Sequence, residues 1–93
     1  MVKLIWTELA IEDLKLIHEY ISKDSKLYAD RFIEKIINRV EQLESFPKSG
    51  RVVPEFDSPE IREIIEGSYR IIYKAAVAQV AILRVHHSAR QLK

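Results

Sequence analysis

Arginines and histidines gather in the C-terminal third of the sequence, and together they could act on a phosphodiester. Arg62, Arg70 and Arg84 lie within one β-rich stretch, which ends at His87. Metal-free cleavage of RNA requires one group to take the 2′-hydroxyl proton, a second to protonate the leaving oxygen, and cations to hold the charge on phosphorus. The fork of arginine matches phosphate oxygens, and histidine can serve as acid or base. If they converge, Arg62, Arg70 and His87 are candidate catalytic residues.

The same cations also have a purely structural interpretation. Arginines on strands commonly extend their polar ends to the rim of the sheet or pair with a neighbouring carboxylate, here Glu63 or Glu66. Arg51 stands in a loop, where it could pair with Glu55 or Asp57 or instead bind a ligand beside the sheet. The residues alone leave both interpretations open.

Several other chemistries lack the residues that they need. The chain has no cysteine, which excludes disulfides and thiolate zinc sites. Adjacent strand residues point to opposite faces, so His86 and His87 cannot share one metal ion, and we expect no metal site. The two glycines lie apart and form no phosphate-binding loop, and no Ser-His-Asp motif is present. We therefore expect no cofactor.

The length and composition indicate one globular domain, spanning residues 1–93. No apolar run approaches the roughly 18 residues that cross a bilayer, and the first ten residues do not resemble a signal peptide. We therefore expect no membrane partner. The absence of cysteine fits a reducing compartment, so we expect a cytoplasmic protein.

The charge is unevenly distributed although its net value is only +1. Residues 67–93 contain no acidic residue, and their cations are Arg70, Lys74, Arg84, Arg90 and Lys93. Such a basic segment can face RNA or an acidic protein. It can equally be a solvated edge that prevents strands of different molecules from pairing.

A strand and two helices are predicted for the first half. Val2–Trp6 is apolar and β-branched, which favours a strand. Thr7 can cap a helix over Glu8–Ser22, and Ser25 can cap a second helix from Lys26 to Ser45. Because so few residues separate the two helices, we expect an antiparallel helical hairpin.

A loop and three strands are predicted for the second half. Residues 47–59 hold all three prolines and form the loop. The strands follow at Ile61–Glu66, Tyr69–Lys74 and Gln79–Val85, and the last is apolar enough for a central position buried on both faces. A type II′ turn at Gly67-Ser68 pairs Glu66 with Tyr69, Ile65 with Arg70 and Arg62 with Tyr73. The fold class is thus α+β, with an N-terminal strand and a helical hairpin packed on a C-terminal antiparallel sheet.

An ordered set of short motifs accompanies this succession of elements. The motifs are Trp6, Ala10, Asp13-Leu14, Ile17, Tyr20-Ile21, Ala29, Phe32, Leu43, Phe46-Pro47, Gly50-Arg51, Ile61-Arg62-Glu63, Gly67-Ser68-Tyr69-Arg70-Ile71-Ile72-Tyr73 and Ile82-Leu83-Arg84-Val85-His86-His87-Ser88-Ala89-Arg90. The pattern resembles the RelE/ParE superfamily of toxins from type II toxin–antitoxin modules, and it covers nearly the whole chain. The resemblance implies the fold predicted above.

The resemblance also implies partners, and it leaves the target open. Toxins of this kind are neutralised by a cognate antitoxin whose flexible segment folds across the toxin. ParE-like members poison DNA gyrase, whereas RelE-like members cleave mRNA on translating ribosomes. A third alternative is a member that binds its antitoxin without toxicity. A homo-oligomer and a hetero-oligomer with the antitoxin both remain open.

The residues that match family motifs favour the ParE-like branch. Arg70 matches a position where nuclease members hold an arginine that contacts phosphate, and Arg62 and Arg51 are weaker matches. Nuclease members often end with a tyrosine after the last strand, but residues 86–92 contain none. For a gyrase poison, the resemblance implies that the basic C-terminal residues contribute to binding, and these are Arg84, His87, Arg90 and Lys93.

Overall fold

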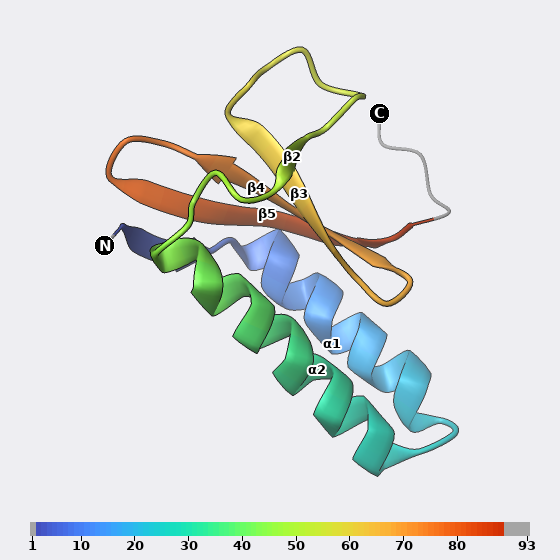
Figure 1. Ribbon diagram of the computed structural model, residues 1–93. Helices are drawn as coiled ribbons and strands as arrows, with labels where there is room; N and C mark the ends of the chain where they lie inside the picture. Colours follow the sequence, from blue (N-terminus) through green and yellow to red (C-terminus); the bar gives the residue numbers. More distant parts are fainter. Residues whose placement is uncertain (1, 89–93) are drawn as a thin grey trace.

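Two helices lie side by side on one face of a five-stranded sheet, and a long loop rises on the other side (Figure 1). The computed structural model describes residues 2–88, so Arg90 and Lys93 lie outside the described residues. The elements in chain order are β1 (Lys3–Trp6), α1 (Glu8–Ser22), α2 (Lys26–Glu41), the 3-10 helix η1 (Gln42–Glu44), β2 (Arg51–Val52), β3 (Ile61–Glu66), β4 (Tyr69–Ala75) and β5 (Gln79–His87).

Side-chain caps begin both helices, as the sequence predicts. The Thr7 Oγ1 accepts a hydrogen bond from the Ala10 N–H, and the Ser25 Oγ accepts one from the Tyr28 N–H. The α1 boundaries are confirmed. The second helix was predicted to reach Ser45, but its α-helical part ends at Glu41 and a single 3-10 turn follows.

The sheet has the strand order β1-β5-β4-β3-β2, and it is antiparallel except where β1 runs parallel to β5. The predicted register of the β3–β4 hairpin is confirmed, with Glu66 opposite Tyr69 and Arg62 opposite Tyr73. Gly67 has a φ of 59°, whereas Ser68 keeps a negative φ. These φ values fit the predicted type II′ turn.

Three predictions about the strands need correction. The proline-rich loop contains the two-residue strand β2, and β5 extends beyond Val85 to His87. β5 is central, but only one of its faces is buried, because Val80, Ile82 and Val85 are enclosed while Arg84 is partly exposed. The helices cover one face of the sheet only, so the outer face of β5 has no second layer.

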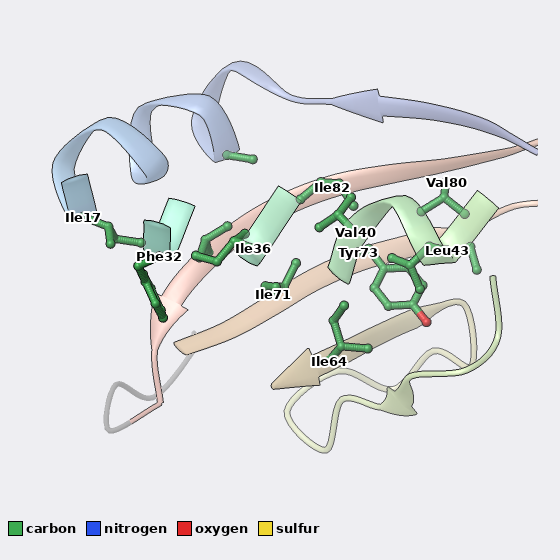
Figure 2. Packing of buried hydrophobic residues seen from close by; sticks show 13 residues of the cluster. Ile17, Phe32, Ile36, Val40, Leu43, Ile64, Ile71, Tyr73, Val80 and Ile82 are labelled. Carbon is green, nitrogen blue, oxygen red and sulfur yellow. The ribbon is translucent and has the colours of Figure 1, made fainter. Parts of the chain in front are cut away.

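A β-bulge brings both halves of β5 onto the core. Ile72 pairs with Arg84 whereas Tyr73 pairs with Ile82, so Leu83 is an extra residue in β5. The extra residue shifts the alternation by one, and Ile82 and Val85 therefore both join the buried cluster. Figure 2 shows this cluster between α2 and the sheet, built from Ile36, Val40, Leu43, Ile64, Ile71, Tyr73, Val80 and Ile82.

Candidate functional site

Arg70 lies on the outer face of β4, and two carboxylates hold its guanidinium. The Arg70 Nε donates to Glu63 at 2.5 Å, while Nη1 and Nη2 donate to the two oxygens of Glu55 at 2.8 and 2.9 Å. The Arg70 side chain is 8% exposed. The Glu55 hydrogen bonds raise the pKa of Arg70 above its usual value, burial opposes them, and Glu63 adds to the increase. The fork that could grip a phosphate is thus occupied by an internal carboxylate.

Glu63 joins the buried Arg70 to the largely exposed Arg51. Its side chain is fully buried, and one oxygen accepts from Arg70 while the other accepts from the Arg51 Nε at 2.5 Å. The sequence suggested Glu55 or Asp57 as partners for Arg51, and the structure corrects this. The β2–β3 register sets Arg51 directly opposite Glu63, and a buried carboxylate requires such a partner.

Arg62 lies on the opposite face of the sheet from Arg70 and holds the chain before β2. Its Nη1 donates to the Gly50 carbonyl at 2.9 Å, and the Gly50 N–H donates to the Tyr73 hydroxyl at 2.9 Å. A Cβ at Gly50 would stand 2.5 Å from the Glu63 carbonyl oxygen and 2.6 Å from the Tyr73 hydroxyl. Only glycine fits this close approach. The Arg62 Nε is buried without a hydrogen-bond partner among residues 2–88.

Arg84 turns to the other edge of the sheet, toward α1. Its Nε and Nη2 donate to the Asp13 carboxylate at 2.8 and 3.1 Å, and the Val85 N–H donates to the same carboxylate at 2.9 Å. Burial alone would raise the pKa of Asp13, but the hydrogen bonds from Arg84 and Val85 outweigh burial and lower it. β1 ends at Trp6 and does not reach Val85, so the Asp13 carboxylate accepts the hydrogen bond of the Val85 N–H at this edge of β5.

His87 lies at the far end of β5, in a row of aromatic rings. Its ring meets Tyr69 edge-on at 5.4 Å, Tyr69 lies 5.4 Å from Phe32, and Phe32 stacks on Tyr28 at 6.4 Å. These rings line one side of a groove between the outer end of the helical hairpin and the sheet. Such aromatic rows give a surface with large apolar contact area.

The groove has a volume of about 690 Å³. We call it the aromatic groove; its lining residues are Asp13, Leu16, Ile17, Tyr20, Ile21, Tyr28, Phe32, Gly67, Ser68, Tyr69, Val85, His86 and His87. Leu16, Tyr20 and Tyr28 are each more than half exposed. Sequence reasoning missed this site. The available signal was the pair Leu16 and Tyr20, which lie one helical turn apart on α1. They fall outside the apolar stripe that helical spacing predicts there, namely Ala10, Leu14, Ile17 and Ile21.

The three candidate catalytic residues are not brought together. Arg70 lies on the outer face, whereas Arg62 and His87 are on the helix side of the sheet. Arg62 pairs with Tyr73 and His87 pairs with Tyr69, which separates them by about 13 Å along β4. In residues 2–88, no three His, Asp or Glu side chains are grouped to hold a metal ion. Nor does any helix there have the length and apolarity of a membrane span.

Comparison with known proteins gives this geometry a context. Residues 4–92 match the family described as ParE toxin of type II toxin-antitoxin system, parDE. This chain belongs to the ParE toxin family. The match spans nearly the whole sequence, so the resemblance to the RelE/ParE superfamily is confirmed. The protein is the toxin component of a type II module, and a cognate antitoxin is the partner that this family implies.

Two relatives extend the comparison. The ParE-family chain is 32% identical to Toxin RelE2 of Caulobacter vibrioides (strain ATCC 19089 / CIP 103742 / CB 15) over 91 residues, which are 97% of this chain and 99% of that protein. It superposes on a chain of the chromosomal ParDE system from P. aeruginosa with a TM-score of 0.76 and 22% identity, covering 94% and 96% of the two chains. The second likeness confirms the α+β fold.

Proposed function

We propose that this ParE-family toxin stops growth by binding its target rather than by cleaving RNA, and that the target is DNA gyrase in the cytoplasm. One observation carries the proposal. The arginine that best matches a phosphate contact of nuclease relatives, Arg70, is buried and doubly paired with Glu55 and Glu63. The Arg70 guanidinium binds carboxylates of the protein itself, and it thereby connects β4 to β3 and to the loop that contains Glu55.

The distribution of the other candidates supports the same conclusion. General acid–base cleavage needs an acid, a base and a cation within hydrogen-bond reach of one phosphate. Arg62 is bound to the backbone at Gly50, and His87 lies against Tyr69 at the other end of the strand. These groups therefore do not surround one phosphate, whereas a binding-type toxin has no need of such convergence.

The basic residues near the C-terminus are the proposed contacts with gyrase. Arg84 and His87 lie along β5, and Arg90 and Lys93 follow in the sequence. Arg84 pairs with Asp13, but its side chain is 38% exposed, unlike that of Arg70. Because β5 extends to His87, a truncation after Val85 would remove paired strand residues. A truncation after Ser88 is the cleaner variant. It should abolish growth inhibition and leave binding to the antitoxin intact; retained toxicity would contradict a role for the last five residues.

Pulse-labelling after tightly controlled induction tests the target. Thymidine and methionine incorporation should be followed side by side in a bacterial host, with a culture that also expresses the antitoxin as control. An early fall of thymidine incorporation is the expected result. An early fall of methionine incorporation would contradict the proposal and favour an attack on translation. Normal growth with a folded toxin would favour the non-toxic alternative.

A RelE-like nuclease is the second candidate, and one observation favours it: the relative with 32% identity carries the name Toxin RelE2. Purified protein should be added to translating ribosomes, and cleavage of the mRNA should be mapped by primer extension. Cleavage would require Arg70 to exchange its carboxylate partners for phosphate. No cleavage by the unaltered chain would exclude this candidate.

We also propose that the antitoxin docks on the aromatic groove. A flexible segment that folds on binding needs apolar surface to offset the loss of conformational entropy. The groove offers exposed Leu16 and Tyr20 next to the aromatic row, and Tyr28 at the end of the row is exposed as well. Among the lining residues that the structure describes, Asp13 is the only acidic one, and it is already paired with Arg84. The lining therefore favours an apolar or acidic segment over a basic one.

A further inference from the structure

The connection between α2 and β3 crosses the edge of the sheet, and its two halves are held on opposite faces. Residues 48–50 lie on the helix side, where Arg62 and Tyr73 bond to Gly50. Residues 53–60, which we call the strap, reach the outer face, where Glu55 meets Arg70. In Figure 1 the strap is the olive-to-yellow loop that rises on the side away from the helices.

Both ends of the strap are anchored, whereas its tip is exposed. The Val53 N–H donates to the Ile61 carbonyl at 3.1 Å, and the Ala75 N–H donates to the Glu60 carbonyl at 2.8 Å. Val53 is fully buried, but residues 54–57 between these anchors are all exposed. Fixed ends and an exposed tip allow residues 54–57 to open locally, away from Val53, without disturbing the sheet.

The pair between Glu55 and Arg70 can break at little cost to the interior. The Glu55 side chain is 28% exposed and would become more hydrated on opening, whereas Arg70 would keep its Nε bond to Glu63. Breaking a buried ion pair is most destabilising when it leaves a buried charge with no partner at all. Here Glu63 remains the partner of Arg70, so opening leaves no orphaned charge.

We propose that the strap opens and closes over the outer face of the sheet, with the ion pair between Glu55 and Arg70 as its latch. In the closed state the carboxylate of Glu55 covers the Nη1 and Nη2 groups of Arg70. In the open state these groups face solvent, and the triad of Arg51, Glu63 and Arg70 stays in place. This inference concerns a motion of the fold and does not rest on the identity of the toxin's target. The open state releases Glu55 only, whereas the RelE-like candidate also requires Arg70 to bind phosphate in its place.

Amide exchange measured by NMR on the purified toxin tests the latch. Glu55→Gln removes the charge with almost no change of shape, and Asp57→Asn makes the same change two residues along the same loop. The reporter is the Phe56 N–H, which donates to the Val53 carbonyl at 3.2 Å within the strap. We expect about tenfold faster exchange at Phe56 in Glu55→Gln, because a charge-assisted bidentate pair is lost, and an unchanged rate in Asp57→Asn.

Each other outcome overturns the proposal. Equal rates at Phe56 in the two variants would mean that the ion pair does not hold the strap. A matching increase at Ile64 and Ile71, in the core of the sheet, would mean that the strap does not open on its own. Glu55→Asp provides a third comparison, since its shorter carboxylate should give an intermediate rate at Phe56.

Discussion

At the scale of single residues, the four arginines of the sheet each have a partner within the protein. Arg51 and Arg70 share the buried Glu63, Arg62 binds backbone carbonyls, and Arg84 binds Asp13. The residue type alone suggested a cationic cluster for a phosphate. The positions of the hydrogen-bond acceptors do not support such a cluster. A partly buried guanidinium must replace its lost hydration, so it binds the nearest oxygen atom that lacks a hydrogen bond.

Gly50→Ala should destabilise the protein by about 2 kcal/mol, through overpacking at the sheet edge. The new Cβ would collide with the Glu63 carbonyl and the Tyr73 hydroxyl, neither of which can move without breaking strand pairing or a buried hydrogen bond. Urea unfolding measures the change. Ser49→Ala, one residue earlier and exposed, is the control and should lie within about 0.5 kcal/mol of the unaltered chain. Equal stability of the two variants would contradict the argument.

At the scale of elements, side chains at the start of α1 tie the helix to β5. The Thr7 Oγ1 caps the helix and also donates to the Ile82 carbonyl at 2.7 Å, whereas Ser25 only caps α2. Thr7→Ala should therefore cost about 2 kcal/mol and Ser25→Ala about 1 kcal/mol. Thermal or urea unfolding of both variants checks this order. A larger loss for Ser25→Ala would show that the bond across to β5 contributes nothing.

Asp13 also connects α1 to β5, and its contribution to stability depends on pH. Its folded-state pKa lies below the usual value, so its contribution is present above about pH 4 and is lost as pH falls through the lowered pKa. Asp13→Asn should cost about 2 kcal/mol at pH 7, because Arg84 and the Val85 N–H lose a charged acceptor. Unfolding free energies measured from pH 7 to pH 3 should converge for the two proteins. A constant difference over this range would contradict the assignment.

The elements were largely predictable because their signals are local. Caps at Thr7 and Ser25 and the glycine turn at Gly67 determine where helices and strands begin, and they lie beside the elements that they control. The strand β2 was missed because two residues are too few to show an alternation of apolar and polar side chains. Only its pairing with β3 reveals it. The partner of Arg84 was equally unpredictable, since Asp13 lies 71 residues away in sequence.

At the scale of the whole molecule, the helical hairpin covers only part of the sheet, and this explains the aromatic groove. The hairpin's outer end, where α1 meets α2, projects beyond the strands (Figure 1). Its apolar residues there have no partner layer, and the turn between β3 and β4 and the end of β5 form the opposite wall. A toxin that must be neutralised by a folding segment benefits from such a preformed apolar surface.

Two leucines on α1 offer a matched test of this surface. Leu16 lines the groove and Leu9 does not, yet they are similarly exposed, at 53% and 60%. Leu16→Ala should weaken antitoxin binding by about tenfold, because it removes apolar contact in the groove, while Leu9→Ala should bind as the unaltered toxin does. Calorimetric titration with the antitoxin measures both. Since neither side chain belongs to the buried core, unfolding should change by less than about 1 kcal/mol in each variant. Equal affinities for the two variants would indicate that the antitoxin binds another face of the toxin.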